Sequence, residues 1–305
     1  MTDRDALLAA ILAQPEEDTP RLMFADWLQE NGEVDRGQFV RLQVEAGQAE
    51  GFSPQARALD AQARALLERH RAAWAPDLPD GVMTWQFARG FIEHATANVA
   101  VFARDAAALF AAHPVRELGL TRFVVAREPV PLSSVFRVPQ LARVRRLDVP
   151  SLAPTPDDFA ALANCPHLTG LTDLNLANNP VPPEWLRALI SGSTFPGLVG
   201  LNLAENVHLS RVLSEALPAA VHRKFVRLDL SHIMFLSDQI QKALASKCVR
   251  DVQELRAGWR ESAGPGPLTH LNLGWTIPLD RLRLQAPNTE TIWAPQARSK
   301  GPHSG

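Results

Sequence analysis

A short leucine pattern that returns every 27 residues constrains this chain's fold more than any other feature. The pattern L-x-x-L-x-L-x-x-N is complete at 171–179 and again at 198–206, and its apolar core continues in phase at 225–230. A degraded copy starts at Val252, and an earlier copy starts at Val144, each one period from its neighbour. Two further matches, out of phase, start at Val115 and Leu268. These matches predict a chain of stacked repeats that share one core.

Within each repeat the sequence predicts one strand and one helix. Leucines at alternate positions of an L-x-L segment point to one side of a strand, and the residues between them point to the other. Helical patterns follow the strands at Thr155-Pro156, at Pro182-Pro183 and at Ser237, where a capping residue or a proline in the first turn starts each helix. The expected fold class is therefore α/β.

This arrangement resembles the ribonuclease-inhibitor-like class of leucine-rich repeats. The resemblance implies a right-handed solenoid in the form of a horseshoe, with a parallel sheet on its concave face and helices on its convex face. It also implies that Asn179 and Asn206 bond backbone groups in the turn that follows each strand. We predict that the solenoid spans 115–294, and that the polar segment 295–305 is a disordered tail.

Residues 1–78 are predicted to form a small α-helical domain. Four helical segments are expected: one around Leu7–Leu12, one from Thr19-Pro20 to Asn31-Gly32, one around Phe39–Val44, and one from Ser53-Pro54 to about Trp74. The next segment, 79–114, alternates apolar and polar residues and then becomes helical. A solenoid end exposes an apolar edge that must be covered, so this segment is the expected N-terminal cap.

The first 43 residues resemble the repeat-companion domain, which is known from planctomycetes and some other bacteria and often precedes leucine-rich repeats. The resemblance rests on an ordered set of residues: Asp5-Ala-Leu-Leu-Ala-Ala-Ile-Leu, Pro15-Glu-Glu-Asp18, Arg21-Leu22, Ala25-Asp26-Trp27-Leu28, Asn31-Gly32, Arg36 and Phe39-Val-Arg-Leu-Gln43. It implies a bacterial origin and this domain order. It implies no mechanism, because the family has no established activity. We interpret Asp26 and Arg36 as members of ion pairs or caps, and Trp27 as a core residue.

Charge is unevenly distributed along the chain. Residues 1–80 hold 8 Lys and Arg against 15 Asp and Glu, a net charge of −7, whereas the remainder has a net charge of +5. The two cysteines lie far apart, and no run of 18 apolar residues or signal peptide is evident. We therefore expect a cytoplasmic protein that does not enter a membrane.

The sequence contains none of the common catalytic or cofactor-binding motifs. The sequence has no phosphate-binding glycine loop, no H-E-x-x-H or C-x-x-C pair, and no EF-hand loop. The nine histidines show no metal-ligand spacing. We predict no enzymatic activity, no catalytic residue, no cofactor and no metal.

The predicted function is that of a protein–protein interaction scaffold with an unidentified partner. If the strands line the concave face, the residues between the leucines point toward that partner. The candidate partner-binding residues are Glu117, Arg146, Asp148, Asp173, Asn175, Asn202, Arg227, Asp229, Glu254, Arg256, His270 and Asn272.

Two alternatives stay open. The solenoid could bind nucleic acid through arginines in its first repeats, namely Arg116, Arg122, Arg127, Arg137, Arg143, Arg145 and Arg146. The chain could instead be an uncharacterised enzyme with a site between the helical domain and the solenoid edge. The sequence leaves the oligomeric state undetermined.

Overall fold

The computed structural model describes residues 2–49, 53–74, 76–122, 130–220, 222–249, 252, 254–259 and 282–285. The chain forms two compact units, Met1–Leu147 (unit 1) and Asp148–Gly305 (unit 2). Both units mix helices with strands, and most strand pairs are parallel. The predicted domain boundaries at 78/79 and 114/115 lie inside unit 1 and stay predictions.

Unit 1 opens with four helices at the positions that the sequence predicts. They are α1 (Asp3–Ala13), α2 (Thr19–Glu30), α3 (Val34–Gln48) and α4 (Pro54–His70). Thr2 and Asp5 form a reciprocal capping box at the start of α1, and Ser53 caps α4. Apolar residues of α1, α2 and α3 share one cluster that includes Ile11, Leu28 and Val40. Burial of these side chains holds the helices together.

The rest of unit 1 is a hairpin, a helix and a parallel strand. Strand β1 (Val82–Ala88) pairs antiparallel with β2 (Phe91–Asn98), helix α5 (Val99–Ala112) follows, and β3 (Glu117–Thr121) pairs parallel with β2. Two 3₁₀ helices, η1 (Leu132–Arg137) and η2 (Pro139–Arg143), then take the place of an α-helix before β4 (Arg146–Asp148). Strand β4 lies where the chain passes from one unit to the other.

Unit 2 repeats a strand followed by helical turns. Its strands are β5 (Asp173–Asn175), β6 (Gly200–Asn202), β7 (Arg227–Phe235), β8 (Glu254–Trp259) and β9 (Leu282–Gln285). Its helical segments are α6 (Pro156–Ala163), η3 (Leu168–Gly170), α7 (Pro183–Ser191), η4 (Val207–Leu209), α8 (Ser210–Ala219), α9 (Ser237–Leu244) and η5 (Lys247–Val249).

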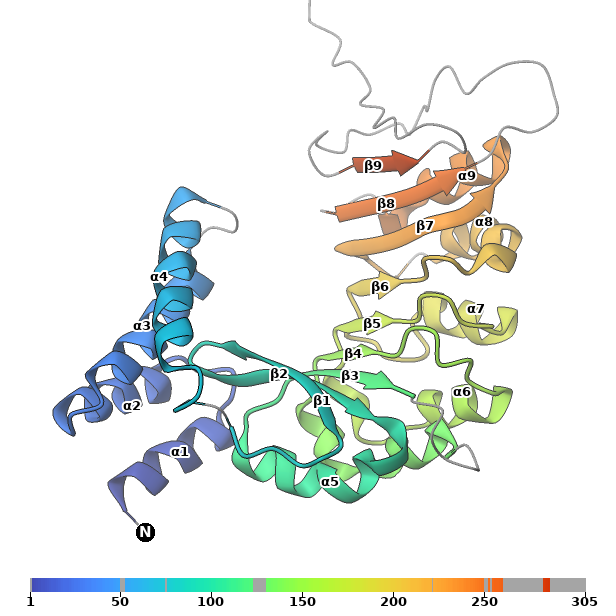
Figure 1. The fold of residues 1–305 in the computed structure, drawn as a ribbon. Helices are drawn as coiled ribbons and strands as arrows, with labels where there is room; N and C mark the ends of the chain where they lie inside the picture. Colours follow the sequence, from blue (N-terminus) through green and yellow to red (C-terminus); the bar gives the residue numbers. More distant parts are fainter. Residues whose placement is uncertain are drawn as a thin grey trace, which may run out of the picture. The chain divides into compact units, whose positions relative to one another are not determined.

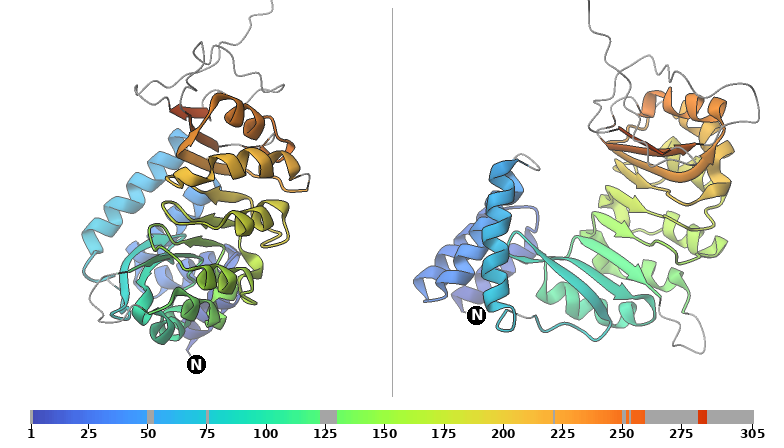
Figure 2. Two further views of the ribbon diagram at one scale, coloured as in Figure 1. Left: turned by 90° about the vertical axis from the view of Figure 1, so that its right-hand side faces the viewer. Right: turned by 45° about the horizontal axis from the view of Figure 1, so that its top comes forward.

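The 27-residue period is also the register of the sheet in unit 2. Leu174 lies opposite Leu201, Leu201 opposite Leu228, and Leu228 opposite Leu255, all in parallel strand pairs. Each of these leucines is at most 3% exposed. The helices α7, α8 and α9 stack on the same side of the strands (Figures 1 and 2). One face of the sheet therefore packs against helices, and the other carries the residues between the leucines.

One repeat position predicted from the sequence was wrong. We expected the strand after Val252 at Leu268, which would shorten the period to 16 residues. Strand β8 instead pairs with β9, and Leu255 lies opposite Leu282, again 27 residues on. The Leu268 motif, with His270 and Asn272, lies outside the described residues.

Asn179 and Asn206 bond backbone groups of the turns, as predicted. The Oδ1 atom of Asn179 accepts from the N–H groups of Leu152 and Ala153, both at 3.0 Å. The Oδ1 atom of Asn206 accepts from the N–H of Asn179 itself at 3.0 Å, and its Nδ2 donates to the carbonyl of Leu176 at 3.0 Å. Each buried asparagine thus joins its own turn to the preceding repeat.

Candidate functional site: the outward strand face of unit 2

The outward face of the strands in unit 2 brings together six of the predicted residues. Asp173 and Asn175 come from β5, Asn202 from β6, Arg227 and Asp229 from β7, and Arg256 from β8. Residues one period apart lie opposite each other in register, so these side chains form rows across the strands. We call this set the strand face. Glu254 belongs to β8, but its side chain is not among those described.

An ion pair spans three strands of the strand face. Arg227 donates from Nε and Nη2 to Oδ1 of Asp173, at 3.0 and 2.6 Å. Gly200 lies between them in register, and a Cβ atom placed on it would collide with Oδ1 of Asp173. Adjacent strands are about 4.8 Å apart, so the arginine reaches two strands away only because the middle residue has no side chain.

A second arginine pairs with the neighbouring strand. Nη1 of Arg256 lies 3.5 Å from Oδ2 of Asp229. In both pairs the arginine is more exposed than its carboxylate: the side chains of Arg227 and Arg256 are 47% and 45% exposed, whereas those of Asp173 and Asp229 are 17% and 18% exposed. The strand face therefore presents guanidinium groups held in place by less exposed carboxylates.

The fifth position of the L-x-x-L-x-L-x-x-N pattern, occupied by Asn175, Asn202 and Asp229, has a structural role that the sequence analysis did not predict. Oδ1 of Asn175 accepts from the N–H of Ala177, Oδ1 of Asn202 from that of Ala204, and Oδ1 of Asp229 from that of Ser231. In each case the side chain bonds its own backbone two residues on, which is why short Asn and Asp side chains suit the end of these strands. The sequence sign of this role is that Asn, Asn and Asp occupy the same position in three successive repeats.

The candidates in unit 1 and at its boundary are more scattered. Glu117 of β3 accepts a hydrogen bond from Nδ1 of His94 at 3.1 Å. That hydrogen bond lowers the pKa of Glu117, against the opposing effect of partial burial. Arg146 is exposed and Asp148 is half-buried.

The arginines of the nucleic-acid hypothesis mostly have partners inside unit 1. Arg116 and Arg145 both pair with Glu16. Arg143 donates to the carbonyl of Phe110 at 2.7 Å, and Arg122 donates to that of Val130 at 3.4 Å. Arg137 is exposed, and Arg127 lies outside the described residues.

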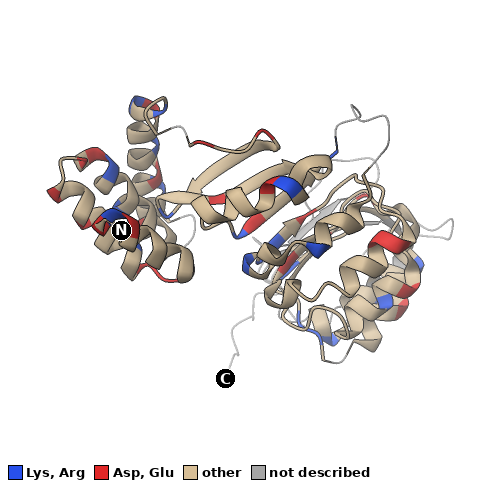
Figure 3. Ribbon diagram, turned by 90° about the horizontal axis from the view of Figure 1, so that it is seen from below, with Lys and Arg blue, Asp and Glu red and all other residues tan. Residues whose placement is uncertain are grey.

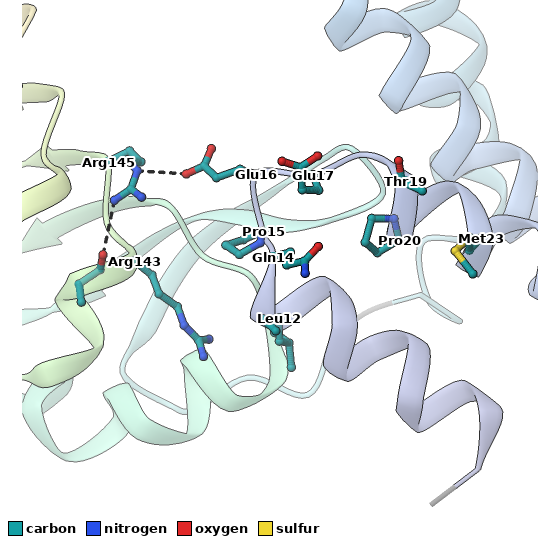
Figure 4. A pocket seen from close by; sticks show the side chains of 12 residues that line it. Leu12, Gln14, Pro15, Glu16, Glu17, Thr19, Pro20, Met23, Arg143 and Arg145 are labelled. Carbon is teal, nitrogen blue, oxygen red and sulfur yellow. Dashed lines mark hydrogen bonds and ion pairs between the residues drawn. The ribbon is translucent and has the colours of Figure 1, made fainter.

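Unit 1 also has a hollow of about 920 Å³ near these arginines. Its wall combines the end of α1 and the start of α2 with residues 142–145 (Figure 4). Met23, 55% exposed, lines it together with Leu12 and Pro20, and the Glu16 side chain points toward Arg145. None of its lining residues is a histidine, serine or cysteine. Its polar side chains include the hydroxyl of Thr19 and the carboxylates of Glu16 and Glu17.

The most buried charges of unit 1 were not predicted as a group. Arg21 is fully buried, and its Nη2 lies 2.8 Å from Oε1 of Glu93, which also pairs with Arg89. Burial lowers the pKa of Arg21 to about 10. Its partner Glu93 lies 72 residues along the chain from Arg21, so the sequence carried no sign of this cluster. Elsewhere on the helices around the N-terminus, basic and acidic segments lie side by side (Figure 3).

The cysteines and the helices give no sign of other sites. Cys165 and Cys248 are both buried, and burial raises the pKa of the Cys248 thiol. Among the described residues, no group of His, Cys, Asp and Glu could hold a metal ion, and no helix is long and apolar enough to cross a membrane. Comparisons with protein-family models, with curated proteins and with solved structures found no match for this chain.

Proposed function

We propose that this chain is a leucine-rich-repeat protein that binds another protein through its strand face. The observation that carries the proposal is the pair of half-exposed arginines on the outward side of the sheet, each held by a carboxylate from a neighbouring strand. In this proposal the repeats form the right-handed solenoid that the sequence resembles. The 27-residue parallel register and the two buried asparagines support it.

Arginine is among the residues that contribute most to protein interfaces. A guanidinium held by an ion pair loses less side-chain entropy when it meets a partner, so less binding free energy is lost on association. Arg227 uses Nε and Nη2 to bind Asp173, and the proposal assigns further N–H donors of this guanidinium to an acceptor of the partner. The proposed role is non-enzymatic, because the polar side chains of the strand face serve in ion pairs and turn caps.

Nucleic-acid binding is the second candidate, and we favour it less. It requires arginines that are free to neutralise phosphates, whereas Arg116, Arg143 and Arg145 have acceptors within unit 1. The resemblance of residues 1–43 to the repeat-companion domain agrees with a repeat protein of bacterial origin. A cytoplasmic location remains part of the proposal on the sequence grounds given above.

The test compares two pairs of substitutions in a pull-down from bacterial lysate. Arg227→Gln with Arg256→Gln changes the strand face. Arg187→Gln with Arg211→Gln removes the same charge from helices α7 and α8, where both arginines pair with Glu215. We expect the first variant to lose its captured proteins, because truncating an arginine that is a hot spot of an interface weakens Kd at least about tenfold, and the second to retain them. Loss in the second variant alone would place the interface on the helices and refute the proposal.

A further inference from the structure

The turn between β1 and β2 is the point where the polar contacts of unit 1 converge. It consists of two residues, Arg89 and Gly90, since Ala88 pairs with Phe91. Figure 1 shows this end of the hairpin beside α3 and α4. Side chains from α2 and α3, together with backbone from the α1–α2 loop, bind both turn residues.

The backbone of the turn is left-handed at both positions. The φ angle is 48° at Arg89 and 85° at Gly90, the combination that a two-residue type I′ turn requires. Asparagine, aspartate or glycine usually occupies the first position, and a larger residue there is strained. An arginine in this conformation points to a specific use of its side chain.

Every N–H donor of the Arg89 guanidinium has an acceptor. Nε and Nη2 donate to the two carboxylate oxygens of Glu93, at 3.0 and 2.9 Å. Nη2 also donates to the carbonyl of Pro15 at 2.8 Å. Nη1 donates to the carbonyl of Glu16 at 3.0 Å and to Oδ1 of Asp18 at 3.1 Å. An arginine has five such donors, so the α1–α2 loop and Glu93 satisfy this side chain completely.

The second turn residue is recognised through its backbone and its lack of a side chain. The N–H of Gly90 donates to Oε1 of Gln43 at 2.8 Å, and its carbonyl accepts from Nη2 of Arg36 at 2.6 Å. A Cβ atom on Gly90 would lie 2.6, 2.8 and 2.9 Å from three carbons of Val40. Such distances do not occur between real side chains without a shift of one partner.

Two arginines, the fully buried Arg21 and the half-buried Arg36, hold the carbonyl groups of the turn. Arg21 donates to the carbonyl of Arg89 at 3.1 Å. The Arg36 guanidinium carbon lies 5.0–5.1 Å from the ring centroids of Phe39, Trp74 and Phe87. Stacking on aromatic rings fixes the plane of a guanidinium, which here aims its Nη2 at the turn.

We infer that the α1–α2 loop, α2 and α3 form a docking site whose ligand is a left-handed Arg-Gly hairpin turn, supplied here by residues 89–90 of the same chain. The recognition residues are Pro15, Asp18, Arg21, Arg36, Val40 and Gln43. All six lie in the stretch that resembles the repeat-companion domain. The role of those residues is therefore to recognise the hairpin turn, and the functional module extends through β2.

Two glycines of this module provide a matched test. Gly32 and Gly90 share a φ of 85°, but a Cβ on Gly32 would have nothing within 4 Å. Both alanine substitutions carry the same left-handed backbone cost, so their difference reports the loss of docking. Hydrogen exchange of the full chain is measured by mass spectrometry, with peptides from β5–β8 as the internal reference.

Gly90→Ala should increase exchange in α1–α3 at least about tenfold more than Gly32→Ala, because overpacking a fixed contact is strongly unfavourable. Adding Val40→Ala, which removes two of the three nearest carbons, should restore part of the protection. Arg89→Lys should also increase exchange in α1–α3, whereas Arg41→Lys, in an ion pair with Asp26, should not. Equal exchange in the two glycine variants, or no effect of Arg89→Lys, would overturn the inference.

Discussion

The two units satisfy their buried polar groups in different ways. In unit 2 the contacts repeat: Asn179 and Asn206 make the same kind of bonds one period apart, to backbone groups 26 to 30 residues away. In unit 1 the contacts occur once and join distant parts of the chain, such as Arg89 with Pro15, 74 residues apart. A contact that recurs in every repeat requires the same residue at a fixed interval, which is visible in the sequence. A contact made once has no such interval.

The chemistry of these contacts also differs. At its buried turns unit 2 uses neutral asparagines, and its buried Arg223 donates to backbone carbonyls, whereas unit 1 buries Arg21 and Glu93 as an ion pair. Removing a charge from water costs far more than removing an amide, and the cost is recovered only if every partner stays in place. The buried ion pair of unit 1 should therefore be more sensitive to single substitutions than the buried asparagines of unit 2.

The largest effect is expected for Glu93→Gln in unit 1. Glu93 is the carboxylate that faces Arg21, Arg89 and Arg116. Its neutralisation leaves the fully buried guanidinium of Arg21 without the carboxylate that it contacts, although Arg89 and Arg116 keep Asp18 and Glu16. We expect the free energy of unfolding to fall by about 3–5 kcal/mol. Urea denaturation with a probe in unit 1 measures the change. A loss below about 1 kcal/mol would show that the buried pairs contribute little.

The corresponding substitution in unit 2 is Asn179→Ala, for which we expect a smaller loss of about 2–3 kcal/mol. It leaves the N–H groups of Leu152 and Ala153 and the carbonyl of Val149 without their partner. Asn164→Ala, at an exposed helix end, is the control and should change stability by less than about 0.5 kcal/mol. The comparison between the units fails if Asn179→Ala destabilises the protein more than Glu93→Gln does.

A third substitution tests the ion pair of the strand face. Gly200→Ala places a methyl group where Oδ1 of Asp173 lies, and we expect a loss of about 1–2 kcal/mol. In an Asp173→Ala background the same change should be close to neutral, because the obstructing carboxylate is gone. Thermal unfolding of the four chains of this double-mutant cycle measures the coupling, and additive effects would contradict the proposed geometry.

The smallest effect is a dependence on pH in unit 1. The hydrogen bond from His94 lowers the pKa of Glu117 below its ordinary value of 4.5. A carboxyl group whose pKa is lowered in the folded state contributes stability above its ordinary pKa, and this contribution is lost as the pH falls through the lowered value. The stability difference between the wild type and Glu117→Gln should therefore shrink below pH 4.5. A difference that stays constant from pH 7 to pH 3 would exclude this pair as the cause.

Much of the strand and helix order could be predicted from local signals. Leucines at alternate positions located strands β3 to β8, and capping residues located the starts of α1, α4 and α6. The prediction failed after Val252, where a local match at Leu268 was preferred to the established period. The register, with Leu255 opposite Leu282, shows that the period was the better guide.

The candidate site was predictable only in part. Alternation along a strand identified which residues point outward, since neighbouring side chains alternate in direction. It did not reveal that Asn175 and Asn202 cap the following turns, nor that Arg227 crosses Gly200 to reach Asp173. Those facts depend on which strands are adjacent and on the space that a missing side chain leaves.

What the sequence determined by itself was the period. Successive segments have the same apolar spacing, so each strand buries leucines at equivalent positions. The strands therefore pair in the same register. What only the tertiary structure decided was the partner of each buried charge. Arg21, Arg36 and Arg89 each meet acceptors dozens of residues away. The physical reason is that burial of a leucine depends on its own spacing, whereas a buried arginine is stable only where the fold brings acceptors to its donors.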